Sequence, residues 1–230
     1  MEDTRRSFHL HLDEVKADVV HLGALVIEAV PRATEVLLSG DFDDAEVLVD
    51  EDDVLDDLTW SIEDRCFHLL ATQQPMASDL RALVTAIRLS SELERSGDLV
   101  VNIVKGAGRI RGSAIDPRTR GLVQQLSGAA RHLMQIAIAA YADGDSVAAA
   151  ALDGLDDQVD SLHRDFIEQI LESCRQGTLD VPAAVQLALI GRYYERIGDH
   201  AVNVGERVRY MVEGWMPDHG DGMSQAGAAT

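Results

Sequence analysis

The sequence has little of what several large classes of protein require. Only two of its 230 residues are cysteines, Cys66 and Cys174, which is too few for a disulfide framework and agrees with a reducing compartment. No apolar run approaches the roughly 20 residues that span a bilayer. The first residues lack the apolar region of a secretory signal. We therefore expect a soluble, cytoplasmic protein.

Positive charge is also scarce. The chain carries 20 lysines and arginines against 40 aspartates and glutamates, a formal net charge of −20. A field of that sign repels the phosphates of nucleic acids and of anionic lipids. We therefore expect no nucleic-acid binding, and contact with a membrane only indirectly through protein partners. Cations and basic protein surfaces are the ligands that this charge favours.

Aromatic residues make up only 4% of the chain, and no long stretch alternates between apolar and polar residues. Helical periodicity dominates instead. Apolar side chains recur every three or four residues from Leu12 to Val36, which predicts one long helix containing Pro31. Gly40-Asp41 and Gly144-Asp145 are typical of one helix ending and the next beginning. Together these signals predict an all-α protein of six long helices.

An internal duplication divides these helices into two sets. The segments 52–64 and 156–168 share a pattern at an offset of 104 positions, the same offset that separates Gly40 from Gly144. The sequence therefore predicts two tandem three-helix bundles, residues 1–112 and 113–213. Residues 214–230 show no periodicity, and we expect them to be a disordered tail.

Each half carries two pairs of acids spaced i, i+4. The pairs are Asp52/Asp56, Glu94/Asp98, Asp156/Asp160 and Glu195/Asp199. This spacing places both carboxylates of a pair on one helix face, where like charges repel. A glycine, Gly97 or Gly198, precedes the second acid of two pairs, although glycine costs a helix about 1 kcal/mol. Oxygen-rich patches of this kind suit iron, zinc, manganese, magnesium or calcium.

Other interpretations of the acids remain open at this point. A single acid pair in so acidic a chain is usually a solvated face, and Arg95 or Arg196 could neutralise the pairs. Repetition favours metal, because E-R-x-G-D-x-x-V-N occurs twice, each time downstream of D-x-x-x-D. Two more repeated pairs, Asp53/Asp157 and Asp64/Glu168, fit surface acids better than ligands. His163 forms an unmatched D-x-x-H, and we expect it to be structural or peripheral.

Residues 74–103 and the segment YYERIGDHAVNV resemble the signature segments of the PhoU family of phosphate-transport accessory proteins, with the likeness extending over about Ser7 to Glu213. The resemblance implies pseudo-twofold symmetry between the bundles. It also implies multinuclear clusters of iron or zinc, with manganese or magnesium as alternatives. By position, the implied ligands are Asp52, Asp56, Glu94 and Asp98 for one cluster, and Asp156, Asp160, Glu195 and Asp199 for the other.

The resemblance further implies a homodimeric negative regulator of phosphate uptake and of phosphate-starvation signalling. Its partners would be the ATPase of the phosphate ABC transporter and a PhoR-type histidine kinase. We expect no enzymatic activity, because no nucleophile–base pattern or phosphate-binding loop is apparent. The alternatives are a carboxylate-bridged di-iron enzyme, which needs E-x-x-H motifs that the chain lacks, and a metal-free helical scaffold.

Overall fold

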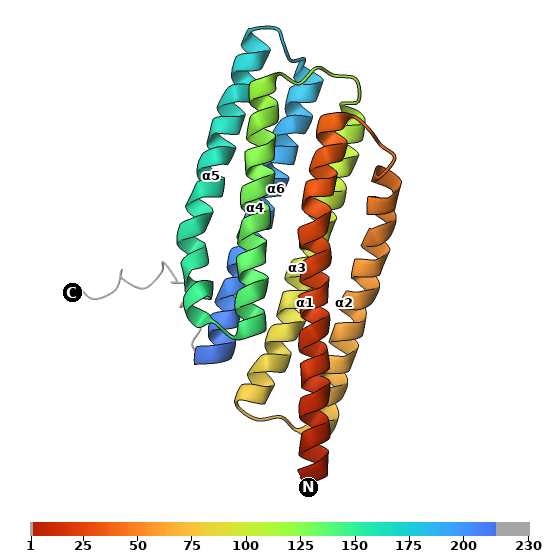
Figure 1. Cartoon of the computed structure of the whole chain (residues 1–230), viewed down its shortest axis with the longest axis vertical. Coiled ribbons are helices and arrows are strands. Elements are labelled where there is room, and N and C mark those ends of the chain that lie inside the picture. Colours follow the sequence, from red (N-terminus) through yellow and green to blue (C-terminus); the bar gives the residue numbers. More distant parts are fainter. Residues whose placement is uncertain (1, 215–230) are drawn as a thin grey trace, which may run out of the picture.

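The structure is a computed structural model that describes residues 2–214, with side chains from residue 6 onward. Within this range the chain forms helices and no strand. The six helices are α1 (Glu2–Ser39), α2 (Ala45–Gln73), α3 (Ser78–Arg109), α4 (Pro117–Asp143), α5 (Ser146–Arg175) and α6 (Val181–Glu213) (Figure 1). The predicted all-α fold of six long helices is therefore confirmed. Of the tail expected at 214–230, all but Gly214 lies outside the described residues.

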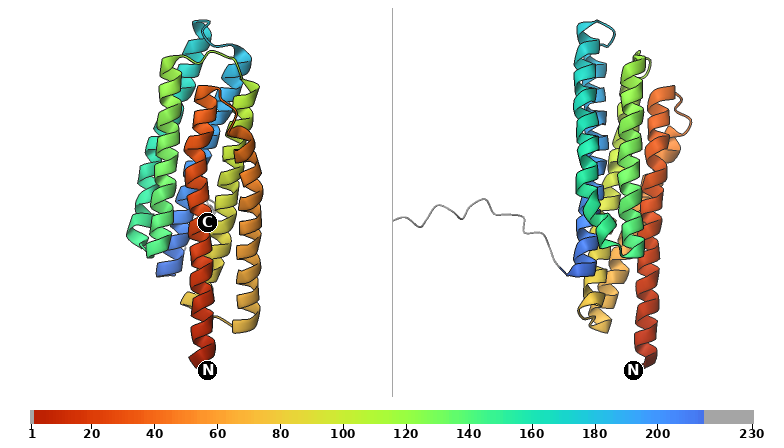
Figure 2. Two further views of the ribbon diagram at one scale, coloured as in Figure 1. Left: turned by 45° about the vertical axis from the view of Figure 1, so that its right-hand side comes forward. Right: turned by 60° about the vertical axis from the view of Figure 1, so that its left-hand side comes forward.

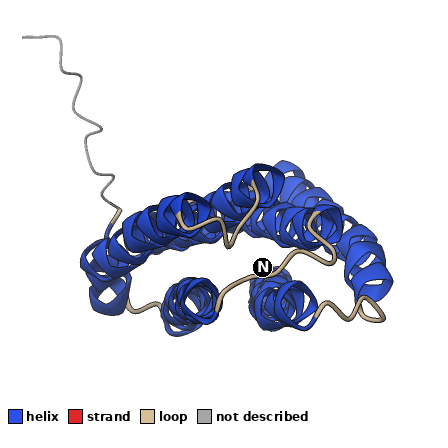
Figure 3. Cartoon of the chain, turned by 90° about the horizontal axis from the view of Figure 1, so that it is seen from above, coloured by secondary structure: helices blue, strands red, loops and turns tan. Residues whose placement is uncertain are grey.

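The helices form two unequal layers. Four of them, in the order α2, α3, α6 and α5, make a curved row, and α1 and α4 lie against one face of it (Figure 3). α3 and α6 contact each other at the centre, whereas α2 and α5 contact helices of their own half only. The helices run along a common long axis, and the start of α1 extends beyond its neighbours (Figure 2). The arrangement leaves the outer face of the row open to solvent.

The core between the layers is almost entirely aliphatic. The predicted seam of α1 is buried, and Val15, Val19 and Leu22 have no exposed surface. One polar contact crosses this core, where the Thr34 hydroxyl lies 2.7 Å from both the Ser127 hydroxyl and the Tyr194 hydroxyl. It joins α1 to α4 and α6, so the two halves share one continuous core.

The sequence predicted one of two helix boundaries correctly from its glycine and capping aspartate. Gly144 ends α4 with φ of 66°, and the Asp145 carboxylate accepts hydrogen bonds from two N–H groups in the first turn of α5, as the sequence predicts. Asp41 is not the cap of α2, which is a correction. α2 begins later, after Asp44, whose carboxylate makes no cap bond because it accepts hydrogen bonds from Arg32 at 2.7 and 2.8 Å.

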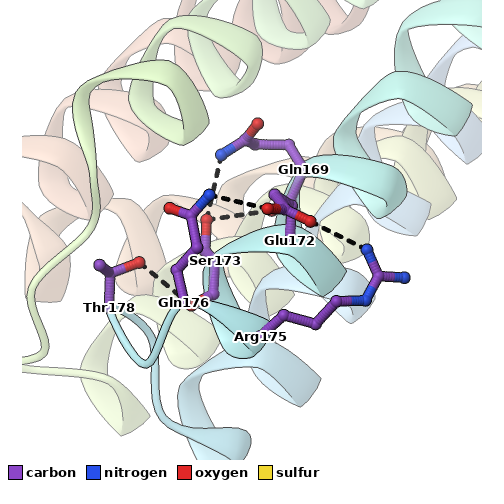
Figure 4. Close-up of polar contacts among 6 residues, drawn as sticks. All are labelled: Gln169, Glu172, Ser173, Arg175, Gln176 and Thr178. Carbon is purple, nitrogen blue, oxygen red and sulfur yellow. Dashed lines mark hydrogen bonds and ion pairs between the residues drawn. The ribbon is translucent and has the colours of Figure 1, made fainter.

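Side chains at the end of α5 hold the connection between the halves in place. Glu172 accepts hydrogen bonds from Arg175 at 2.9 Å and from Gln176 at 2.7 Å (Figure 4). The Ser173 hydroxyl donates to Oδ2 of Asp116 at 2.8 Å. Asp116 is the N-cap of α4. The bond therefore fixes the linker that joins α3 to α4 against the C-terminal end of α5.

Candidate metal centre

The first group of predicted ligands comes together between α2 and α3. Asp52 and Glu94 are half-buried, whereas Asp56 and Asp98 are exposed. Burial, with added repulsion from Asp98 and Asp56, raises the pKa of Asp52 above its ordinary value. Burial and the same neighbours raise the pKa of Glu94 as well, with a contribution from Asp52. The four carboxylates therefore share one electrostatic environment, which disfavours their joint ionisation.

No basic side chain neutralises this first group. Among the described residues, none of its four carboxylates forms an ion pair with an arginine or a lysine. Arg95, which could have done so, is exposed and acts on Glu94 only through Coulomb attraction, which opposes the rise in the pKa of Glu94 without reversing it. Lys105 acts on Asp52 only through the longer-range Coulomb attraction. The group is thus an uncompensated concentration of negative charge.

The second group lies between α5 and α6. Burial, followed by repulsion from Asp199 and Asp160, raises the pKa of Asp156 to about 6. The Oδ1 atom of Asp156 is buried and has no hydrogen-bond partner. A buried carboxylate oxygen without a donor is costly, and a bound cation is one way of satisfying it.

Arg192 distinguishes the second group from the first. It forms an ion pair with Glu195, whose side chain is only 12% exposed, and its Nη2 lies 3.7 Å from Oδ2 of Asp199. Arg196, the neutralising residue that the sequence suggested, is exposed and takes no such role. The position matching Arg192 in the first repeat, at the offset of 101 that relates α3 to α6, is Ser91. One acid group therefore contains an internal cation and the other does not.

The two unexpected helix glycines lie where neighbouring helices come closest. A Cβ atom added at Gly198 would lie 2.7 Å from Oδ1 of Asp156. One added at Gly97 would lie 2.5 Å from Cδ1 of Leu55 and 3.6 Å from Oδ1 of Asp52. Each glycine thus lets α2 or α5 approach closely beside the acids. At Gly198 the space is taken by the carboxylate itself.

The donors suit a metal ion chemically, but they are not yet arranged around one. Within residues 2–214, no three His, Cys, Asp or Glu side chains form a group ready to hold a metal ion. The carboxylates nevertheless lie on packed helices, and rotation about their side-chain bonds would change their oxygen positions. The unpartnered oxygen of Asp156 and the uncompensated charge of the first group are the features that fit a cation.

His163 and His200 lie in environments that the sequence pattern did not indicate. Nε2 of His163 is buried without a hydrogen-bond partner, and burial together with nearby Arg192 lowers the pKa of this residue. His200 donates from Nδ1 to Oε2 of Glu92 at 2.6 Å, and the Asn203 amide donates to the same oxygen at 3.1 Å. This contact joins α6 to α3. The sequence feature that could have indicated this contact is a break in the repeat, because Leu99 occupies the position in α3 that matches His200 in α6.

Comparison with known proteins agrees with this architecture. The sequence model of the PhoU domain matches the chain twice, at residues 19–107 and 123–208. A relative from Clostridium acetobutylicum, named phosphate-specific transport system accessory protein PhoU homolog, is 29% identical over 95% of this chain and 100% of its own. A Mycobacterium tuberculosis protein, PhoU homolog 1, is 32% identical over 93% of this chain and 96% of its own.

Crystal structures of PhoU proteins share the fold of this chain. The crystal structure of PhoU from Pseudomonas aeruginosa superposes with a TM-score of 0.85 at 27% identity, covering 90% of this chain and all of that one. The crystal structure of PhoU from Streptococcus pneumoniae superposes with a TM-score of 0.84 at 26% identity, covering 92% of this chain and 99% of that one. None of the helices in the described part is long and apolar enough to cross a membrane. The fold, the doubled acid motif and the two domain matches together show that this chain belongs to the PhoU family.

Proposed function

We propose that this protein is a non-catalytic regulator of phosphate uptake and of phosphate-starvation signalling. The support is the naming of its full-length relatives as accessory proteins of the phosphate-specific transport system. In this proposal the protein acts in the cytoplasm as a homodimer. It links the ATPase of the phosphate transporter to a PhoR-type histidine kinase, and it restrains uptake when phosphate is plentiful.

The proposed regulator binds metal at both acid groups. Asp52, Asp56, Glu94 and Asp98 hold one cluster of iron or zinc, and Asp156, Asp160, Glu195 and Asp199 hold the other. The observation that carries this proposal is the buried, unpartnered Oδ1 of Asp156, whose carboxyl is repelled by the neighbouring acids Asp199 and Asp160. A cation at either group would supply the positive charge that the carboxylates lack and would fix two helices relative to each other.

An adaptor role agrees with where the acid groups lie. α2 and α5 flank the row and have no neighbour outside their own half, so each acid group lies at the junction of a central and a flanking helix. A chain of net charge −20 presents such surfaces to basic partners. Bound cations would lower that negative charge locally, and metal occupancy would then control which partner docks.

Metal quantification on native protein tests the proposal. The protein is purified without chelators and without a histidine tag, and bound metal is measured by elemental analysis. We expect Glu195→Gln with Asp199→Asn to remove about half of the metal, and Glu94→Gln with Asp98→Asn to remove the other half. Asp165→Asn with Glu213→Gln makes the same charge change on α5 and α6 at exposed positions, and it should leave the metal content unchanged.

Other outcomes point to the alternatives. Native protein with no bound metal would support a metal-free scaffold. Equal loss from both groups in either double variant would mean that the clusters are shared between bundles. Oxygen-dependent turnover by the iron-loaded protein would support a di-iron enzyme. Copurification from phosphate-replete cells tests the adaptor role, which is abandoned if neither the ATPase nor the kinase is recovered while an unrelated partner is.

A further inference from the structure

A second polar site lies away from both acid groups, where α1 and α3 end and α4 begins. A cavity of about 400 Å³ opens there. Its lining residues are Leu37, Leu38, Ser39, Gly40, Phe42, Ala107, Ile110, Arg111, Gly112, Ser113, Ile115 and Arg120. The lining combines an apolar wall with two arginines and contains no aspartate or glutamate. In a chain with twice as many acids as bases, this composition is unusual.

The two arginines of this cavity are not neutralised by the protein. The guanidinium of Arg111 lies 4.8 Å from the centre of the Phe42 ring, and Arg120 is half-buried on the first turns of α4. Within the described residues, neither guanidinium forms an ion pair with a carboxylate. Their charge is therefore available to a ligand.

Three acids close in sequence to the cavity residues have partners of their own. Asp41 accepts a hydrogen bond from the backbone N–H of Asp43 at 3.1 Å. Asp44 is paired with Arg32. Asp116 accepts hydrogen bonds from the first turn of α4 and from Ser173, and these bonds lower the pKa of its carboxyl despite the opposing effect of burial. None of these three carboxylates forms an ion pair with Arg111 or Arg120.

We propose that this cavity binds a small phosphorylated organic molecule of about nucleotide size. Its phosphate contacts Arg111 and Arg120, because planar guanidinium groups bind phosphate oxygens through paired, charge-assisted hydrogen bonds. The Ser113 hydroxyl, also in the lining, is a further donor. The apolar or aromatic part of the ligand lies against Phe42, Ile110 and neighbouring aliphatic side chains. A volume of about 400 Å³ falls within the range of small-molecule sites.

The overall charge of the protein selects a small ligand over a polymer. Charges more than about 8–10 Å apart are screened at physiological ionic strength, so a small anion in the cavity responds mainly to the two arginines. A nucleic acid or an anionic membrane would also contact the acidic surface around the cavity and would be repelled by it.

The position of the cavity gives the ligand a means of acting on the whole molecule. Phe42 and Arg111 belong to the first half, whereas Arg120 belongs to α4 of the second, so one bound ligand contacts both halves. Gly112, with φ of 86°, allows the chain to turn between them. The site is separate from the acid groups, and its occupancy does not depend on whether those groups bind metal.

Calorimetric titration of the full chain tests this proposal. The probes are AMP, inorganic phosphate and adenosine, each titrated at low salt in the presence of a chelator, so that no metal-bridged phosphate contributes. We expect AMP to bind in a 1:1 ratio, inorganic phosphate to bind at least tenfold more weakly, and adenosine not to bind. Arg111→Gln and Arg120→Gln should each weaken AMP binding at least tenfold.

Two arginine variants outside the cavity and one acid-group variant serve as controls for AMP binding. Arg109→Gln and Arg118→Gln remove neighbouring arginines that do not line the cavity, and both should bind AMP as the unchanged protein does. The Glu195→Gln/Asp199→Asn variant should also bind AMP normally. The proposal is overturned if no probe binds at millimolar concentration, if binding appears only without chelator, or if Arg111→Gln and Arg120→Gln bind AMP unchanged while circular dichroism shows them folded. Equal affinity for phosphate and AMP would overturn the role of the apolar wall.

Discussion

Oδ1 of Asp156 lies only 2.7 Å from the position that a Cβ atom on residue 198 would take. Only glycine at position 198 leaves this space, so α6 accepts a residue of low helix propensity in order to admit a carboxylate from α5. The same carboxylate oxygen lacks a hydrogen-bond donor. The glycine and the acid therefore form a single structural unit.

Gly198→Ala should displace the Asp156 carboxylate while leaving the fold intact. The added methyl group meets the far end of a side chain that can rotate, and alanine gains about 1 kcal/mol of helix propensity. We expect loss of metal from the second group with little change in melting temperature, measured by elemental analysis and by thermal unfolding. Gly97→Ala is the comparison, because its methyl group meets buried Leu55 and overpacks the interface by about 1–3 kcal/mol. Unchanged metal content in Gly198→Ala would contradict this account.

Arg192→Ser should make the second group bind divalent cations more tightly. The substitution removes the internal cation that pairs with Glu195, and it reproduces the first repeat, where Ser91 occupies the matching position. The Arg192 side chain is 48% exposed, so solvent screens its attraction for the acids and limits it to about 1 kcal/mol. We therefore expect a two- to fivefold decrease in dissociation constant, measured by competition with a metal indicator. Arg196→Ser, which removes an exposed arginine one turn away, should have a smaller effect. Equal effects of the two substitutions would show that only net charge matters.

Asp156→Asn should stabilise the metal-free protein at neutral pH. The folded-state pKa of about 6 exceeds the ordinary value of 3.8, so the folded protein binds this proton more tightly than the unfolded chain does. The resulting stability is fully present below about pH 3.8 and is lost as the pH rises through 6. The difference between these two pKa values corresponds to at most about 3 kcal/mol, and solvent screening reduces it to about 1 kcal/mol.

Urea unfolding in the presence of a chelator measures this difference. The variant should exceed the unchanged protein in stability at pH 7.5, and the two should converge toward pH 4. With metal present the order should reverse, because asparagine is a poorer ligand than a carboxylate. A difference that does not depend on pH would mean that the penalty at position 156 is not electrostatic.

His200→Ala should loosen the contact between the two halves. The Glu92 side chain is only 16% exposed, and hydrogen bonds from His200 and Asn203 outweigh the effect of burial and lower its pKa. Removing one donor from a largely buried carboxylate costs about 2 kcal/mol. A double-mutant cycle with Glu92→Gln, followed by urea unfolding, should give a coupling energy of about 1 kcal/mol. Simple additivity would show that the contact contributes nothing to stability.

The helices follow from local patterns. The apolar seam of α1 and the Gly144-Asp145 boundary each depend on residues within a few turns of one another, and each is confirmed. The repeat was visible as two similar segments of the chain, and the PhoU domain model matches the chain twice. Local patterns failed at the start of α2. There Arg32, twelve residues away along the chain from Asp44, takes the carboxylate that would otherwise cap the helix.

The acid motifs were identifiable from spacing, but their surroundings were not. The i, i+4 rule places Glu195 and Asp199 on one face of α6 in any helix. The same rule allows Arg192 to pair with Glu195 three residues later, but it does not indicate that Arg192 rather than Arg196 does so, or that His200 reaches Glu92, 108 positions earlier in the chain. The latter contact depends on how α3 packs against α6, which no local pattern encodes.

The sequence alone determined the six helices, their duplication and the positions of eight acids, because helix periodicity and i, i+4 spacing are properties of neighbouring residues. Only the tertiary structure decided which carboxylates are buried, that Oδ1 of Asp156 lacks a donor, and that two unpaired arginines and an aromatic ring line one cavity. Burial and charge pairing depend on atoms that are distant in the chain and adjacent in space. They are fixed only when the helices have packed.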